Sequence, residues 1–194
     1  MGLPISTYKR YTVEEYLELS LNSTNRLEFE SGLIVDMGRT TLIHSEIVVN
    51  TSTIFRQQVA DKKCRVFVET VGLEVQEKDT YFLPDILITC HEEDLVANDM
   101  VRHPSLIVEV TSPESVSRDR NLKFQSYLKI PSLLYYIIIP QDQVRVEIFG
   151  KMESGRGWSF TFFESLDDTI LLEKLALSFK VSDAYENIRL NQYK

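Results

Sequence analysis

The segment Ser105-Leu-Ile-Val-Glu-Val-Thr111 restricts the possible folds of this chain more than any other stretch. It is apolar on both sides apart from one glutamate, a pattern typical of a central strand whose two faces are both covered. Because side chains alternate between the faces of a strand, Glu109 shares a face with Ile107 and Thr111. A lone carboxylate there costs several kcal/mol unless it is protonated, paired or bound to a cation. We therefore expect Glu109 to be buried, in either a salt bridge or a cation site.

The remaining pattern predicts an α/β (α+β) fold in one domain that spans residues 1–194. Thr12-Val-Glu-Glu15 has the form of a capping box and begins a helix that continues to Leu19. Further helices are expected at 41–59, 117–129 and 181–188. Strands are expected at 26–29 and 33–37, as a hairpin around Ser31-Gly32, and at 65–75, 81–90, 105–111, 133–139, 143–149, 158–163 and 169–172. Strands outnumber helices, so we expect a mixed β-sheet flanked by helices.

Composition and charge exclude several classes of protein. The 194 residues suit one domain, and apolar runs are no longer than a strand, so no membrane span is expected. The first ten residues lack the apolar stretch of a signal peptide, and Cys64 and Cys90 lack a CxxC spacing. Both features favour a reducing cytoplasm, with Cys90 as a core residue. The net charge of -8 excludes a uniformly basic nucleic-acid binder but leaves room for a local basic stretch.

A second carboxylate, Asp85, stands at the beginning of another apolar strand, directly after Pro84. On its own, an aspartate after a proline is typical of a turn. The chain between Asp85 and Glu109 is nevertheless long enough for a strand, a loop and a return along a neighbouring strand. The two carboxylates would then converge and offer oxygen ligands to a hard cation such as Mg²⁺.

Basic residues gather on the helix expected after Glu109. Lys123 on this helix would stabilise a water or a developing phosphate charge beside a cation. Arg118 and Arg120 belong to the only basic stretch placed to approach a phosphate backbone, so we take them as candidate DNA contacts. Taken alone, a lysine on a surface helix is unremarkable.

The histidines and one acidic segment carry weaker signals. His44 lies on the helix expected at 41–59, where a lone histidine is more typical of packing than of catalysis. The acidic stretch 91–99 is typical of a solvated connection rather than of a metal site. His91 and His103 lie in or near loops and receive no role.

A series of short motifs occurs in order along the chain. They are Tyr11-Thr-Val-Glu-Glu-Tyr16, Arg26-Leu-Glu-Phe-Glu-Ser-Gly32, Ile34-Val-Asp-Met37, His44, Pro84-Asp-Ile-Leu87, Pro104-Ser-Leu-Ile-Val-Glu-Val-Thr-Ser-Pro113, Asp119-Arg-Asn-Leu-Lys123, Tyr127 and Pro131. In this order and spacing, from Tyr11 to about Phe149, the chain resembles the Uma-type restriction-endonuclease-like proteins, a branch of the PD-(D/E)XK nuclease superfamily.

The resemblance implies a restriction-endonuclease-like core with acidic residues gathered at one end of its sheet. It also implies roles for five residues. Asp85 and Glu109 match the metal-binding carboxylates, for Mg²⁺ or Mn²⁺, and Lys123 matches a catalytic lysine that has moved from a strand to a helix. Glu28 and His44 match additional positions of the catalytic site.

Three positions depart from the family pattern. The usual lysine of the superfamily would stand where this chain has Thr111. Leu27 replaces an aromatic residue, and Gly38-Arg-Thr-Thr41 replaces a loop that is commonly richer in serine and proline. With Thr111 in place of the usual lysine, the chemistry is kept only if the ammonium of Lys123 reaches the metal-bound water from the helix. The other two differences affect substrate contacts more than the five matched positions.

The resemblance predicts a Mg²⁺-dependent endonuclease that hydrolyses phosphodiester bonds of DNA, with a homodimer as a possible assembly for cutting both strands. A different class of function is a non-catalytic binding or scaffold module that keeps the nuclease fold, which the acidic net charge favours. A third is a hydrolase of another phosphate ester. A fold by itself does not decide between them.

Overall fold

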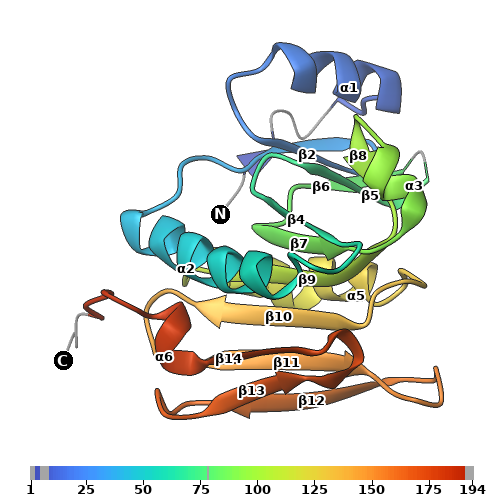
Figure 1. The fold of residues 1–194 in the computed structure, drawn as a ribbon. Helices are drawn as coiled ribbons and strands as arrows, with labels where there is room; N and C mark the ends of the chain where they lie inside the picture. The colour runs from blue at the N-terminus through green and yellow to red at the C-terminus, as the bar shows by residue number, and fades with distance from the viewer. Residues whose placement is uncertain (1–2, 5–8, 78, 191–194) are drawn as a thin grey trace.

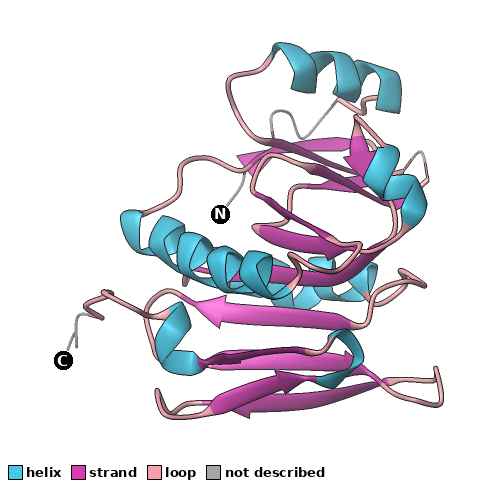
Figure 2. Ribbon diagram, in the orientation of Figure 1, coloured by secondary structure: helices cyan, strands magenta, loops and turns pink. Residues whose placement is uncertain are grey.

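The structure is a computed structural model that describes residues 3–4, 9–77 and 79–190. The prediction about the N-terminal ten residues therefore falls mostly outside the described part of the chain. Figures 1 and 2 show a mixed arrangement of strands and helices, which confirms the expected fold class. Among the described residues, no helix combines the length and the apolar character needed to cross a bilayer.

Two six-stranded sheets replace the single sheet that we expected. The first has the order β1-β3-β2-β6-β5-β8, formed by Leu3–Pro4, Leu33–Asp36, Leu27–Glu30, Thr80–Phe82, Gly72–Gln76 and Met100–Val101. The second has the order β12-β11-β10-β9-β7-β4, formed by Trp158–Phe163, Val146–Lys151, Tyr135–Pro140, Pro104–Thr111, Ile86–Thr89 and Arg65–Val68. A hairpin of β13 (Thr169–Leu172) and β14 (Leu177–Lys180) completes the β structure.

The split into two sheets comes from breaks in two segments that we predicted as continuous strands. The segment 65–75 bends at Glu69, whose φ is +52°, so that β4 joins the second sheet and β5 joins the first. The segment 81–90 is interrupted at 83–85, so that β6 and β7 also fall in different sheets. Each break carries the chain from one sheet to the other.

The central strand has the character expected from its sequence. β9 pairs in parallel with β10 and antiparallel with β7, and Glu109 lies opposite Ile138. Leu106 and Val108 belong to one hydrophobic core, and Ile107 belongs to another on the opposite face. The predicted alternation of side chains is therefore confirmed, and the two cores lie on the two sides of the second sheet.

Helices cover these cores. α2 (Leu42–Gln58) contributes Ile47 and Phe55 to the first core and lies in front of the second sheet in Figure 1. The second core includes Tyr127, from the helical segment behind that sheet, together with Phe82 of the first sheet. α1 (Val13–Asn22) packs Tyr16 against the interior strands β3, β2 and β6 of the first sheet and begins with the predicted Thr12 capping box.

The helix expected at 117–129 is irregular. It consists of α4 (Val116–Arg118), a π-helical stretch η1 (Asp119–Lys123) and α5 (Phe124–Tyr127). A π-helical turn inserted in an α-helix is frequent at functional sites. The insertion brings Lys123 and Asp119, both buried, to the inner side of the helix.

Some elements differ from the expectation. The stretch 91–99 contains a short helix, α3 (Glu92–Val96), and Asp94 in this helix is buried. The prediction that this stretch is a solvated connection was therefore wrong for Asp94. The last helix, α6 (Val181–Ala184), is shorter than expected, and strand β14 before it and the 3-10 turn η2 (Glu173–Leu175) were not predicted.

Cys64 and Cys90 form a disulfide, which corrects the expectation of two free thiols. Cys64 directly precedes β4 and Cys90 directly follows β7, and these strands pair antiparallel from Arg65 opposite Thr89. The two cysteines are therefore cross-strand neighbours. Cys90 packs beside the first core, but as half of a disulfide rather than as a lone apolar residue.

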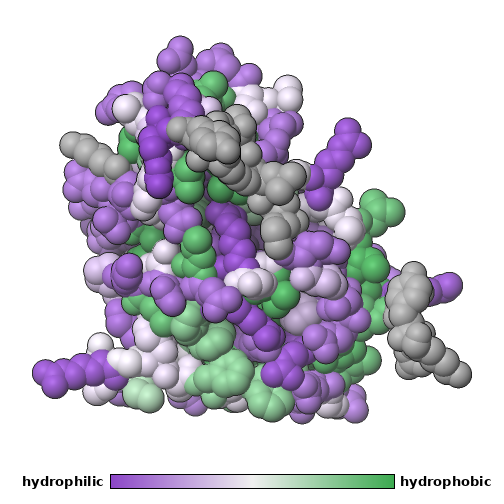
Figure 3. Space-filling model, turned by 180° about the vertical axis from the view of Figure 1, so that it is seen from behind, coloured by the Kyte–Doolittle hydropathy of each residue, from purple (hydrophilic) through white to green (hydrophobic). Residues whose placement is uncertain are grey.

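The far end of the second sheet carries aromatic side chains. Phe160 and Phe162 of β12 are about half exposed, and the ring of Phe160 lies 4.9 Å from that of Phe149 on β11. In the view from behind, apolar side chains gather low on the molecule, on the side where Figure 1 draws these strands (Figure 3).

Candidate active site

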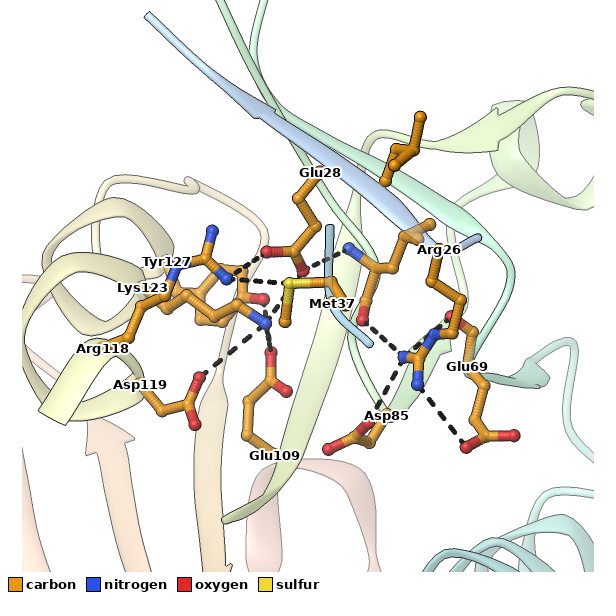
Figure 4. A network of polar contacts seen from close by, with 12 residues as sticks. Arg26, Glu28, Met37, Glu69, Asp85, Glu109, Arg118, Asp119, Lys123 and Tyr127 are labelled. Carbon is orange, nitrogen blue, oxygen red and sulfur yellow. Dashed lines mark hydrogen bonds and ion pairs between the residues drawn. The ribbon is translucent and has the colours of Figure 1, made fainter. Parts of the chain in front are cut away.

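A cavity of about 230 Å³ lies where the two sheets meet, and four of the five predicted catalytic residues line it. These four are His44, Asp85, Glu109 and Lys123. The fifth, Glu28, is fully buried directly behind Lys123, in contact with it (Figure 4). The structure therefore brings together side chains from β2, α2, β9, the break before β7 and the π-helical turn.

The two predicted metal carboxylates come from neighbouring strands. Asp85 directly precedes β7, and the pairing of Ile86 with Val108 places it beside the end of β9 that carries Glu109. Asp85 Oδ2 accepts a hydrogen bond of 2.8 Å from the N–H of Val110. This bond fixes Asp85 next to Glu109, since Val110 is the following residue of the same strand.

Glu109 is held by two donors. Its Oε1 accepts hydrogen bonds from Lys123 Nζ at 3.0 Å and from the Tyr127 hydroxyl at 2.6 Å. Burial raises the pKa of Glu109 well above its ordinary value; the Lys123 charge opposes the rise, while nearby carboxylates such as Asp85 add to it. The salt bridge that we considered for Glu109 is thus present, inside the cavity and shared with other acids.

Lys123 joins three carboxylates from three elements. Its Nζ lies 3.0 Å from Glu28 Oε1, 3.0 Å from Glu109 Oε1 and 3.8 Å from Asp119 Oδ1. Burial alone would lower the pKa of Lys123, but Glu109, Glu28 and Asp119 raise it above its ordinary value. The three carboxylates therefore favour the charged form of the amino group. It reaches Glu109 from the helix, and the strand position two residues after Glu109 is occupied by Thr111.

Asp85 also faces a second set of side chains, in which His44 was predicted as a site residue and Arg26 and Glu69 were not. His44 Nε2 lies 3.2 Å and Arg26 lies 3.5 Å from Asp85 Oδ1. Glu69 Oε1 lies 4.0 Å from His44 Nε2, and the three potential ligand atoms of His44, Glu69 and Asp85 are within 4.8 Å of one another. The Glu69 backbone N–H also donates to the Asp85 carbonyl at 3.0 Å.

Several site residues were missed because their sequence contexts are ordinary. Glu69 lies in a stretch that reads as strand, and Asp119 reads as a solvated residue on a helix. Tyr127 reads as a core residue. The left-handed backbone of Glu69 and the π-helical turn at Asp119 are structural signals of a functional site, but neither follows from residue type.

The two arginines proposed as DNA contacts lie in different places. Arg118 lines the cavity and pairs with Glu28 Oε2. Burial would raise the pKa of Glu28, but Lys123 and Arg118 together hold it below its ordinary value. Arg120 points elsewhere and pairs with Glu147 of β11 beside the Phe149 and Phe160 rings.

Comparison with known proteins agrees with this fold and identifies a family. A model of the Uma2 family, described as "Putative restriction endonuclease", matches residues 13–183. The uncharacterized protein sll1609 of Synechocystis sp. is 32% identical over 159 residues, which cover 81% of this chain and 89% of that protein. The uncharacterized protein slr1290 of the same organism is 27% identical over 185 residues, which cover 95% of this chain and 96% of that protein.

A solved structure shares the fold. It is described as a putative nuclease belonging to DUF820 from Anabaena variabilis, and it superposes with a TM-score of 0.73 at 19% sequence identity. The match covers 90% of this chain and 97% of the other. The family match supports a nuclease-like function, and the structural match supports the fold. Because the family model covers most of its length, this chain belongs to the Uma2 family.

Proposed function

We propose that this protein is a metal-dependent endonuclease that hydrolyses phosphodiester bonds of DNA, with Mg²⁺ or Mn²⁺ as its cofactor. One observation carries the proposal: Asp85 and Glu109, from adjacent strands, line one cavity together with the buried ammonium of Lys123. Carboxylate oxygens are the ligands that these hard cations prefer.

The donors of the cavity fit a divalent cation. Among the described residues, Glu109 Oε2 receives no hydrogen bond, because Lys123 and Tyr127 both donate to Oε1. His44 Nε2 is buried without a properly aligned hydrogen bond, although Asp85 Oδ1 is only 3.2 Å away. Asp85 and Glu109 would hold the cation, with His44 or Glu69 beside it. Bound there, it would supply Lewis-acid stabilisation of the charge that develops on the phosphate.

Lys123 would act through its charge rather than as a base. Its raised pKa keeps the amino group protonated, so it would stabilise negative charge on the phosphate during bond cleavage. Glu28 positions Lys123 through a contact of 3.0 Å. His44 would contact the phosphate or transfer a proton, since its ring lies at the cavity wall.

The charge of the cavity lining supports a nucleic-acid substrate despite the net charge of -8. Arg26, Arg39 and Arg118 line the cavity along with Lys123. They balance the four carboxylates of the same lining, Asp85, Glu109, Glu114 and Asp119, so the cavity lacks the net negative charge of the molecule as a whole. We infer that Arg118 contacts the DNA backbone. A homodimer would allow both strands of a duplex to be cut in one encounter.

Cleavage of plasmid DNA with Mn²⁺ or Mg²⁺ tests the proposal. We expect Glu109→Gln and Lys123→Ala each to slow cleavage by about 100-fold or more. Glu147→Gln is a matched control, because Glu147 is equally buried and lies opposite the same Ile138 from the other side, on β11. The control should retain activity. Direct appearance of linear product would support a homodimer, whereas accumulation of nicked circles would contradict it.

Measurements of DNA binding and of DNA cleavage together separate an enzyme from a non-catalytic binding module. We expect Arg118→Ala to weaken DNA association and to flatten its salt dependence, and Arg120→Ala to do so less because Arg120 pairs with Glu147 away from the cavity. Salt-sensitive DNA binding without cleavage of duplex, single-stranded or branched DNA by either metal would contradict the enzymatic proposal. That outcome would favour the non-catalytic module.

A further inference from the structure

A second group of potential metal ligands lies at the other end of the β7–β9 pair. Asp85 directly precedes β7, whereas His91 follows it, and His103 directly precedes β9. The four residues of β7 separate the two ends by roughly 13 Å. Glu93 lies in α3, the short helix that begins after His91. This group is therefore separate from the cavity of the proposed nuclease.

The three side chains converge although they come from two connections. The rings of His91 and His103 are stacked, with their centroids 3.9 Å apart and their planes at 20°. One potential ligand atom from each of His91, Glu93 and His103 lies within 4.8 Å of the others. Two imidazole nitrogens and one carboxylate oxygen are the ligand set of many zinc sites that keep a further position for water. Imidazole also favours nickel, copper and cobalt over magnesium.

A buried carboxylate that faces the His103 ring from the protein interior is an independent indication of a metal site. Asp94 is only 3% exposed, and its Oδ1 lies 3.5 Å from His103 Nδ1. Among the described residues, this Nδ1 has no aligned hydrogen-bond partner although it is inaccessible to solvent. A histidine that binds a metal commonly turns its other ring nitrogen to a carboxylate, which fixes the ring and increases the basicity of the ligating nitrogen.

Asp94 is itself held rigidly. It accepts hydrogen bonds from the Thr89 hydroxyl at 2.7 Å and from the backbone N–H groups of Arg102 and His103, each at 2.9 Å. These bonds tie the end of β7, α3 and the start of β9 to one carboxylate. The carboxylate that faces the His103 ring is therefore held in place by the fold, unlike the carboxylate of a mobile surface side chain.

We propose that His91, Glu93 and His103 bind a transition-metal ion of the zinc class, and that Asp94 positions His103 through its Nδ1. The ion would join the connection after β7 to the connection before β9. It would stabilise the far end of the strand pair that carries Asp85 and Glu109. His103 would coordinate through Nε2, the nitrogen opposite to the one that faces Asp94.

Titration of the tag-free, metal-stripped protein with Zn²⁺ and Co²⁺ tests this site. The experiment uses Asp85→Asn as the background, because this substitution removes a carboxylate of the cavity and leaves the second site intact. We expect one equivalent to bind, a rise in melting temperature with Zn²⁺, and visible absorption bands with Co²⁺. Absence of a stoichiometric site in this protein would overturn the proposal.

Substitutions then identify the ligands. His91→Ala and His103→Ala should each weaken binding by more than about 100-fold, and Asp94→Asn should weaken it by about 10- to 100-fold. His91 is exposed, so its variant keeps the test valid even if Asp94→Asn fails to fold. The chain has only three histidines, and His44→Ala is the matched control that should leave this binding unchanged. Loss of the ion in His44→Ala, or its retention in both other histidine variants, would place the ion elsewhere and overturn the proposal.

Discussion

Glu69 combines a strained backbone with a place in the candidate metal site. Its φ of +52° lies in the left-handed region, which costs about 1–2 kcal/mol for a residue that has a Cβ. Its carboxylate nevertheless faces His44 and its N–H donates to the Asp85 carbonyl. A strained residue at such a position is typical of sites where function outweighs stability.

Two substitutions at Glu69 separate strain from function. Glu69→Gly and Glu69→Ala lose the same carboxylate, but only glycine relieves the left-handed strain, so the glycine variant should be about 0.5–1 kcal/mol more stable than the alanine variant. Both should bind Mn²⁺ more weakly than the wild type. Urea unfolding and Mn²⁺ titration measure the two effects. Ala176→Gly, at a φ of +50° outside the cavity, should increase stability without changing Mn²⁺ binding. Weaker Mn²⁺ binding in that control would contradict the role of Glu69.

Because the pKa of Glu109 is raised in the folded protein, its contribution to the free energy of unfolding decreases as pH rises. Above the ordinary value of 4.5, the unfolded chain has released a proton that the folded state still holds, so the contribution of Glu109 to stability falls as pH rises from 4.5 towards the folded pKa. Glu109→Gln has no such proton. The unfolding free energy of the wild type minus that of the variant should therefore decrease with rising pH in metal-free buffer. Urea unfolding at a series of pH values measures it, and a flat or rising difference would contradict the prediction.

Among the individual site residues, the sequence indicated those whose charge does not suit the apolar segment around them. Glu109 and Asp85 stood out because a carboxylate beside or inside an apolar strand needs a reason to be there. Lys123, Glu28 and His44 drew their weight from the family resemblance. Glu69 and Arg26 could not be predicted as site residues. Their roles depend on a bend of the chain between the two sheets, and no residue type at this point of the sequence predicts that bend.

Among the elements, regular ones were predictable and interrupted ones were not. The helix at 42–58 follows from periodic apolar residues, and strand β9 follows from a run that is apolar on both faces. The first helix follows from its capping box. The breaks at 69 and at 83–85 lie in stretches rich in β-forming residues, so local propensity favours continuous strands there. The π-helical turn has the composition of an ordinary helix, and its buried residues Asp119 and Lys123 belong to the site.

The disulfide ties an edge strand to the strand that leads from Asp85. It links cysteines that are 26 residues apart, so it restricts the unfolded chain by an amount worth about 3 kcal/mol. We expect a reductant to lower the unfolding free energy by about 2–4 kcal/mol, as measured in urea. The double variant Cys64→Ser/Cys90→Ser should be as unstable as the reduced protein and should not respond to the reductant. A reductant effect that persists in this variant would contradict the assignment.

For the whole molecule, the two sheets are interleaved along the chain. Strands of the first sheet occur between residues 3 and 101, and strands of the second between 65 and 163, so β4 and β7 of the second lie among β5, β6 and β8 of the first. No single cut of the chain separates the sheets. We therefore expect the protein to unfold as one domain, in one cooperative transition.

Calorimetry tests the one-domain prediction. The calorimetric and van't Hoff enthalpies should agree for the metal-free protein, and far-ultraviolet circular dichroism and tyrosine fluorescence should follow the same transition. Two separate transitions, or a proteolytic fragment that keeps one sheet folded, would contradict it. The C-terminal hairpin does not provide such a fragment, because Ile170 and Phe179 pack in the first core together with Phe55.

The contacts of Glu28 have a consequence for synthesis on the ribosome. Glu28 is made early but is buried completely in the finished protein, where its charge is balanced by Arg118 and Lys123. A nascent chain that ends before these residues would have to bury the carboxylate without its partners, at a cost of several kcal/mol. We therefore expect the first sheet to complete its folding only after the helix that follows Glu109 has left the exit tunnel. Until then, its apolar face is accessible to chaperones.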